Sequence, residues 1–351
     1  GRRRPACAWG VAPGVIIAGR KWPPGRGVCV DDRQLLVRLG TGAVSGDALA
    51  REAGVTRAAV WKRIEALRSA GVEIEARPGQ GYVLAHPPDL LDLAGLQAAL
   101  AGVLVAGRDS LELAWSLDST NSELLRRPPP AGTLVLLAER QTAGRGRLGR
   151  AWNTPLAGQV CLSVRRGFDG GLARLGGLSL VAGVAVAEAL RALGFASVGL
   201  KWPNDLVAGD RKLAGLLVEG GGEYAGPVQA VVGIGINVRL PAAVAAAIDQ
   251  PWTDLAGLAP DGRPPSRNTV AAAVLQRLLP ALDAFDRDGL APFLPRYETL
   301  DVLAGRPVRV LAGREVVDGQ AIGLAVDGGL RVRTGEGDRI FHAGEVSVRP
   351  R

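Results

Sequence analysis

Three glycines and three arginines stand within residues 143–152, and this segment restricts what the chain can fold into more than any other. Glycine takes positive φ without steric cost, so the backbone can curl and expose its N–H groups. The arginines supply guanidinium groups, which bind phosphate and carboxylate. The segment therefore predicts a flexible cationic loop that closes over a polyanionic small molecule.

The spacing of Gly144, Gly146 and Gly149 also matches the G-x-G-x-x-G turn of dinucleotide-binding folds. In that turn the last glycine opens a helix whose N-terminus meets the pyrophosphate. Here the loop runs within a few residues into Pro155, which stops a helix. A dinucleotide-binding domain is therefore not the favoured interpretation.

Composition limits the classes of protein to which this chain can belong. With 351 residues, 47% of them apolar, the chain can form two or three domains around a sizeable core. Its longest apolar helical candidate, residues 175–187, is shorter than the about 20 residues that a bilayer requires, so no membrane segment is expected. The net charge of +8 favours an anionic partner. Three cysteines without a CxxC pair and two distant histidines argue against a disulfide framework or zinc site and suit a reducing cytoplasm.

Residues 31–86 are predicted to form a winged helix-turn-helix domain. Apolar spacing and capping residues predict helices near residues 35–39, 47–52 and 57–69, with Thr56 as the cap of the third. A hairpin of residues 72–75 and 82–84 follows. The third helix would present its N-terminal part to the major groove of DNA. The predicted DNA contacts are Thr56, Arg57, Ala58, Trp61 and Lys62. The plainer alternative is the solvated basic face of an amphipathic helix.

The remaining chain divides at two further points. After prolines 87 and 88, residues 90–301 mix strands and helices without clean β-α-β alternation, which predicts an α+β domain with a mixed sheet. The pattern of residues 302–351 predicts four short strands that form a small β-barrel. Residues 1–30 begin with basic and apolar residues that imitate a signal peptide, but their prolines favour an unassigned tail, either an over-extended gene start or a disordered segment.

Five motifs carry a resemblance to one known family, and four of them occur in that family's order and spacing. They are residues 118–121, 143–152, 201–205, 211–215 and 233–237. On these motifs the chain resembles the bifunctional biotin–protein ligases over residues 32–349. The resemblance implies a central sheet domain like that of class II aminoacyl-tRNA synthetases and an SH3-like C-terminal domain. One departure is Leu148, where well-known members often carry a basic residue.

The resemblance also implies an activity. Such an enzyme joins biotin to ATP as biotinyl-5'-adenylate, with Mg²⁺, and transfers biotin to a lysine of the carrier domain of acetyl-CoA carboxylase. Loaded with adenylate it forms a homodimer and represses the biotin operon at its operator DNA. A lipoate–protein ligase, and a biotin-sensing regulator with weak ligase activity, are the alternatives.

Particular residues are assigned to these steps. The expected catalytic residues are Arg145, Arg147, Asp205 and Lys212, with Asp205 also the expected Mg²⁺ ligand because hard cations prefer carboxylate oxygen. Arg145, Arg147 and Lys212 are also expected to contact biotin, together with Ser119, Thr120, Asn121, Gln141, Gly144 and Gly215. The expected nucleotide-binding residues are Trp152, Asn204 and Asn237. Simpler interpretations are a helix cap for Ser119 and Thr120, a turn cap for Asp205, a surface position for Lys212 and a core position for Trp202.

Overall fold

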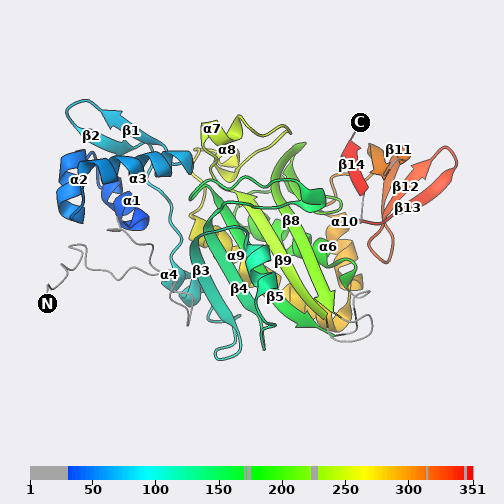
Figure 1. Ribbon diagram of the computed structural model, residues 1–351. Helices are drawn as coiled ribbons and strands as arrows, with labels where there is room; N and C mark the ends of the chain where they lie inside the picture. Colours follow the sequence, from blue (N-terminus) through cyan, green and yellow to red (C-terminus); the bar gives the residue numbers. More distant parts are fainter. Residues whose placement is uncertain are drawn as a thin grey trace.

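The computed structural model describes residues 31–169, 171, 175–222, 228–313, 315–343 and 346–350. The predicted tail, residues 1–30, lies outside the described residues. The described chain forms three successive units, with the helix-turn-helix unit and the C-terminal sheet on opposite sides of a central sheet domain (Figure 1). No helix in the described part of the chain is long and apolar enough to cross a membrane.

The first unit is the predicted winged helix-turn-helix. Its elements are α1 Asp32–Gly40, α2 Gly46–Ala53, α3 Arg57–Ser69, β1 Ile74–Arg77 and β2 Gly81–Leu84. The Thr56 hydroxyl accepts a hydrogen bond from the Ala59 N–H, as the capping pattern predicts. Gly54 ends α2 in the left-handed region at φ 67°. The hairpin begins at Ile74 rather than residue 72, because Val72 donates its N–H to the Leu67 carbonyl and closes α3.

The central domain is built on a seven-stranded mixed sheet. Its order is β3-β4-β5-β9-β8-β7-β6, with β3 and β4 parallel and the other neighbours antiparallel. The strands are β3 Ser110–Leu117, β4 Leu134–Gln141, β5 Gln159–Phe168, β6 Val198–Lys201, β7 Asp205–Ala208, β8 Arg211–Gly222 and β9 Val228–Asn237. This arrangement confirms the mixed-sheet α+β prediction.

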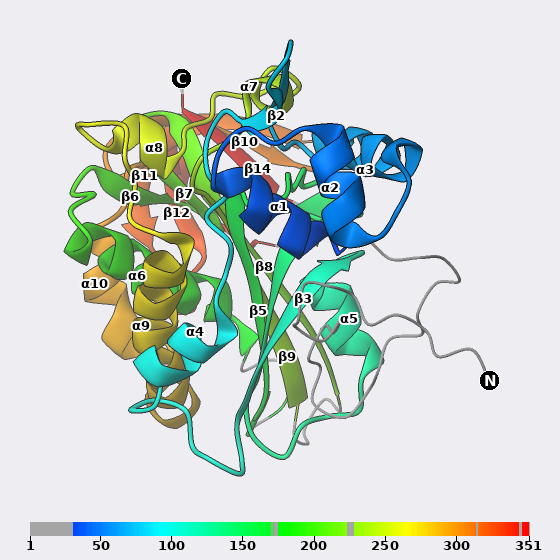
Figure 2. The same cartoon turned by 90° about the vertical axis from the view of Figure 1, so that its left-hand side faces the viewer.

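Helices cover the two faces of the sheet unequally. The long helices α6 Leu178–Ala192 and α9 Arg267–Asp288 pack on each other and on one face, and α5 Thr120–Arg126 lies on the other (Figure 2). The shorter helices are α4 Leu93–Ala99, α7 Ala242–Ala245, α8 Leu255–Leu258 and α10 Leu294–Glu298. Helix α6 begins at Leu178 and not at residue 175, because Gly177 precedes it at φ 85°. Side chains alternate along β8, so Leu216 packs toward α6 and Gly215 faces the opposite side.

The C-terminal unit is a five-stranded antiparallel sheet of order β13-β12-β11-β10-β14. Its strands are β10 Pro307–Ala312, β11 Glu315–Leu324, β12 Leu330–Thr334, β13 Gly337–Phe341 and β14 Val346–Pro350. The sequence predicted the other four and missed β13. That strand carries Asp338 and Arg339, whose charges pair across the sheet with Arg333 and Glu315 and hide the apolar alternation.

The helix-turn-helix unit packs directly on the central domain. Leu156 donates its N–H to the Ala70 carbonyl at 2.8 Å, and its side chain is buried in the core of the first unit. In the central domain, the fully buried Arg267 pairs with Glu139 at 2.5 Å and donates a hydrogen bond to the carbonyl of Asp89 in the linker. The linker is therefore fixed to the sheet that carries the cavity described next.

Candidate active site

A cavity of about 690 Å³ opens on the face of the sheet away from α6 and α9. The 145–153 loop, the start of α5, strands β4 to β9 and residues 247–252 line it, and β14 adds Val348 and Arg349. Twelve of the thirteen predicted small-molecule residues lie in this lining, and only Gly144 does not: the twelve are Ser119, Thr120, Asn121, Gln141, Arg145, Arg147, Trp152, Asn204, Asp205, Lys212, Gly215 and Asn237. The twelve residues, predicted from separate motifs, meet in one place.

One end of the cavity, the α5 end, is lined by the neutral polar side chains Ser119, Thr120, Asn121 and Gln141, and Ser163 contacts two of them from outside the lining. The Gln141 side-chain oxygen accepts from the Thr120 N–H at 2.8 Å. The Ser163 hydroxyl lies 2.7 Å from the Thr120 hydroxyl and 2.6 Å from the Asn121 side-chain oxygen. Ser119 caps α5 through the Ser122 N–H, so the simpler interpretation holds for it even though it also lines the cavity.

Glycine at two positions leaves room for the side chains of this region. A Cβ at Gly233 would lie 2.2 Å from the Asn121 side-chain oxygen, so only glycine leaves room for that amide. A Cβ at Gly144 would lie 2.5 Å from the Trp152 carbonyl and 3.0 Å from the Gln141 nitrogen. Gly144 therefore does not line the cavity itself, but it allows the loop to pass close to Trp152 and Gln141.

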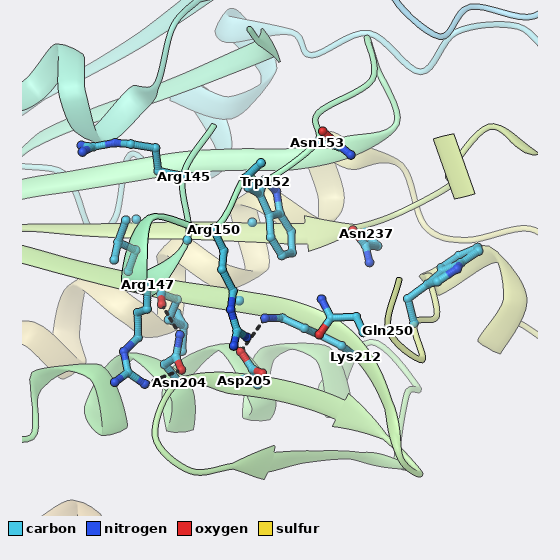
Figure 3. A pocket seen from close by; sticks show the side chains of 18 of the residues that line it. Arg145, Arg147, Arg150, Trp152, Asn153, Asn204, Asp205, Lys212, Asn237 and Gln250 are labelled. Carbon is cyan, nitrogen blue, oxygen red and sulfur yellow. Dashed lines mark hydrogen bonds and ion pairs between the residues drawn. The ribbon is translucent and has the colours of Figure 1, made fainter. Parts of the chain in front are cut away.

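The other end, the cationic end, gathers Arg147, Arg150, Lys201 and Lys212 around Asp205. The Lys212 ammonium pairs with Asp205 at 2.7 Å. Figure 3 shows Arg150 extending toward the same pair from the loop. Burial lowers the pKa of Lys201 and of Arg147, so both cations are partly removed from water. Such a site favours a ligand with several negative charges.

The two predicted loop arginines point in different directions. Arg147 donates to the Asn204 side-chain oxygen at 3.1 Å and to the Ala343 carbonyl of the C-terminal unit. Arg145 turns away from Asp205 (Figure 3) and donates to Ser122 at 3.0 Å and Glu219 at 3.1 Å. In this conformation Arg147 lies at the cationic end, and Arg145 is held beside α5.

Trp152 lies against Lys212 and Gly235. Its ring lies 5.5 Å below the Lys212 ammonium, and a Cβ at Gly235 would lie 2.7 Å from the ring. Trp202, by contrast, is buried and donates its indole N–H to the Gly328 carbonyl at 3.0 Å, which confirms its predicted core position.

Sequence reasoning missed several lining residues, namely Arg150, Gln159, Lys201, Trp252 and Arg349. Arg150 and Lys201 belong to recognised motifs, so their position in a motif was the available signal. Trp252 and Arg349 come from distant segments that only the folded chain brings to the cavity. Gln159 looked like an ordinary polar residue at the start of a strand.

The Mg²⁺ expected at Asp205 has no preformed site in the described part of the chain. In the described ranges no three His, Cys, Asp or Glu side chains form a group that could hold a metal ion. Asp205 is one carboxylate and is already paired with Lys212. It fits a cation only if ligand phosphates supply further oxygens and attract Lys212 away.

The predicted DNA contacts lie on an exposed surface. Thr56, Arg57, Ala58, Trp61 and Lys62 are all exposed at the N-terminal half of α3. Arg57 pairs only loosely with Asp47, at 3.8 Å. Trp61 is 54% exposed, which is unusual for a large aromatic side chain in a single folded unit.

Comparison with known proteins identifies the family. The biotin/lipoate A/B protein ligase family matches residues 113–237, an HTH domain matches residues 33–83, and the biotin protein ligase C-terminal domain matches residues 304–349. The chain is 39% identical to the bifunctional ligase/repressor BirA of Escherichia coli over 311 residues, which cover 87% of this chain and 92% of that one.

Two further relatives agree. The biotin–[acetyl-CoA-carboxylase] ligase of Mycobacterium tuberculosis is 34% identical over 74% of this chain and 96% of its own. The structure of the Aquifex aeolicus biotin protein ligase with biotin and ATP superposes with a TM-score of 0.58, at 30% identity, over 69% of this chain and 99% of that one. The chain belongs to the biotin protein ligase family, and it carries a helix-turn-helix domain.

Proposed function

We propose that this protein activates biotin with ATP to biotinyl-5'-adenylate and transfers biotin to a lysine of the carrier domain of acetyl-CoA carboxylase. One observation carries the proposal: a single cavity joins a neutral, hydrogen-bonding end at α5 to a cationic end at Asp205 and Lys212. The neutral end suits the ureido ring of biotin, and the cationic end suits its carboxylate and the phosphates of ATP. The similar Aquifex aeolicus biotin protein ligase, solved with biotin and ATP, supports these two ligands.

In the first step a carboxylate oxygen of biotin bonds to the α-phosphorus of ATP, and the bond from that phosphorus to pyrophosphate breaks. Negative charge increases on the phosphoryl oxygens during this exchange. Lys212 and Arg147 stabilise it, because fixed cations lower the barrier most where charge develops. Arg145 joins them when it leaves Glu219. Lys212 exchanges its contact with Asp205 for one with the ligand.

The nucleotide occupies the cationic end between the loop and residues 247–252. Asn204, Trp152 and Asn237 line this side, with Trp252 and Arg349. When bound, Mg²⁺ neutralises phosphate charge, and Asp205 would hold it together with phosphate oxygens. Asp205 thereby acquires a partner in place of Lys212.

In the second step the carrier lysine attacks the acyl carbon of the adenylate, and AMP leaves with the bonding electrons. The attacking amine comes from the carrier, so the protein supplies no nucleophile of its own. Asp205 orients this amine, and the closed loop keeps water from the mixed anhydride.

The helix-turn-helix domain makes the protein a biotin-dependent repressor in the cytoplasm. The adenylate-bound protein forms a homodimer on operator DNA with two half-sites related by two-fold symmetry. The exposed residues at the start of α3 support this role. In a footprinting experiment, the full-length Lys62→Ala variant should bind operator DNA more weakly and keep its ligase activity. Unchanged binding would remove Lys62 from the interface.

The deciding experiment is ATP–pyrophosphate exchange with purified protein, with biotin, lipoate or no acid. Exchange with biotin alone supports the proposal. Exchange with lipoate alone would assign the chain to the other branch of the matched ligase family. No exchange from folded protein that still binds DNA would favour a biotin-sensing regulator with weak ligase activity.

A further inference from the structure

Gln159 lies at the start of β5, directly opposite Asn237 of β9, and its side chain is 3% exposed. Its side-chain oxygen accepts from the Trp152 indole N–H at 3.1 Å. Its side-chain nitrogen donates to the Asn237 side-chain oxygen at 2.8 Å. Asn237 in turn donates to the Thr253 carbonyl at 3.0 Å. Four residues from four segments thus form one hydrogen-bonded chain.

The direction of this chain is fixed by its ends. An indole N–H can only donate, and a backbone carbonyl can only accept. Gln159 must therefore accept on one side and donate on the other, which a side-chain amide does and a carboxylate or an alkyl group does not. The residue type at position 159 follows from this requirement.

The chain closes on Lys212. The Thr253 N–H donates to the Lys212 carbonyl at 2.9 Å, and the Lys212 N–H donates to the Pro251 carbonyl at 2.9 Å. At the other end of the same lysine, the ammonium lies 5.5 Å from the Trp152 ring centre. Gln159 thus connects the ring below the Lys212 ammonium to the segment that holds the Lys212 backbone.

Gln159 is itself held from behind. Its backbone carbonyl accepts from the Arg267 Nε at 2.7 Å, and Arg267 is fully buried against Glu139. Because the start of β5 is held by hydrogen bonds on both sides, it moves little. The Gln159 amide can therefore keep Trp152 and Asn237 at a fixed distance from each other.

We propose that Gln159 is a positioning residue for adenylation, acting through Trp152 and through residues 251–253 on Lys212 and on the nucleotide side of the cavity. This inference rests on the proposed function and adds a residue that no motif indicated. Gln159 acts through its neighbours and need not touch the reacting atoms.

The test compares Gln159→Leu with Gln276→Leu in the full-length protein. Gln276 lies on α9 and donates to the Ala99 carbonyl, so the control removes one glutamine hydrogen bond away from the cavity. The loss of one or two hydrogen bonds should raise the KM for ATP about 3- to 10-fold in pyrophosphate exchange, with the KM for biotin within twofold. The control should change neither. An unchanged kcat and KM for ATP, or equal rises in the KM for ATP and the KM for biotin, would overturn the proposal.

A double-mutant cycle identifies the path. In the Trp152→Phe background the indole N–H is absent, so Gln159→Leu should raise the KM for ATP by a smaller factor than in the wild type. Equal factors in the two backgrounds would contradict the link through Trp152.

A measurement on the wild type needs no activity, and a variant serves only to assign the signal. The Trp152 indole N–H, assigned by its loss in Trp152→Phe, should exchange with solvent slowly in NMR spectra. Fast exchange, at the rate of an exposed indole, would overturn the proposal. If the wild type lacks pyrophosphate exchange with biotin yet protects this proton, the proposed function fails while the hydrogen-bonded chain stands.

Discussion

The α5 end and the cationic end of the cavity are held in place by different means. The neutral side chains of the α5 end hydrogen-bond to one another within the central domain, at 2.6–3.1 Å. The cationic end instead draws on a surface loop, strands β6 to β8 and the C-terminal unit, where Ala343 and Arg349 take part. A rigid end built by one domain suits recognition of a small uncharged ring. An end assembled from several segments can rearrange as phosphates bind and leave.

Lys212→Ala breaks the cationic end most directly. Removing one charged group that stabilises the developing phosphoryl charge should lower the rate of adenylation on the order of 10²–10³-fold. Single-turnover formation of biotinyl-adenylate measures this rate. Lys62→Ala removes a lysine from the exposed face of α3 and is the matched control. A wild-type rate for Lys212→Ala would assign charge stabilisation to the arginines instead.

Arg147→Ala should release the loop from Asn204 and from the Ala343 carbonyl. A charged hydrogen bond contributes about 1.5–3 kcal/mol, so adenylate should dissociate about 10- to 100-fold faster. Release of preformed, labelled adenylate gives the rate, and Arg309→Ala, which removes an arginine of β10 that pairs with Asp318 and does not line the cavity, is the control. Unaltered retention would show that Arg147 does not hold the loop closed.

Gly233→Ala tests the rigidity of the α5 end. The added Cβ would meet the Asn121 oxygen at 2.2 Å, and Asn121 cannot withdraw easily because Leu217 and Glu219 accept from its nitrogen. An overpacked site of this kind costs about 1–3 kcal/mol, which should appear mainly in the KM for biotin. Gly221→Ala, with nothing within 4 Å of its Cβ, should have no effect. Equal KM values for the two variants would mean that the α5 end adapts.

The same contrast explains what the sequence could predict. Residues 118–121 and 201–205 are contiguous motifs, so most of their site residues could be predicted before the fold was known, although Lys201 was missed. Arg349 lies more than a hundred residues from Lys201 and reaches the cavity only because β14 pairs at the edge of the C-terminal sheet. Gln159 was invisible for another reason, since its role depends on donors and acceptors from three other segments. Composition and spacing predict the helix-turn-helix and the mixed sheet, but not contacts of that kind.

The smallest expected effect is a pH dependence of the KM for ATP that distinguishes the cationic end from the α5 end. Burial lowers the pKa of Lys201. The neighbouring cations Lys212 and Arg349 lower that pKa further, while the Asp205 carboxylate acts to raise it. As pH rises through this lowered value, Lys201 loses its charge earlier than an ordinary lysine, so the KM for ATP should rise. One charge in a partly solvated site contributes about 1 kcal/mol, or roughly fivefold in KM.

Lys201→Arg should abolish that rise, because the guanidinium keeps its proton. The KM for biotin should rise less over the same range, because only its single carboxylate reaches the cationic end and the Ser, Thr, Asn and Gln side chains of the α5 end do not titrate there. Both constants are measured by pyrophosphate exchange between about pH 7 and pH 10, the range in which lysines with lowered pKa values lose their protons. A parallel rise for biotin and ATP would show that the two ends are electrostatically one site, and that their division is one of geometry alone.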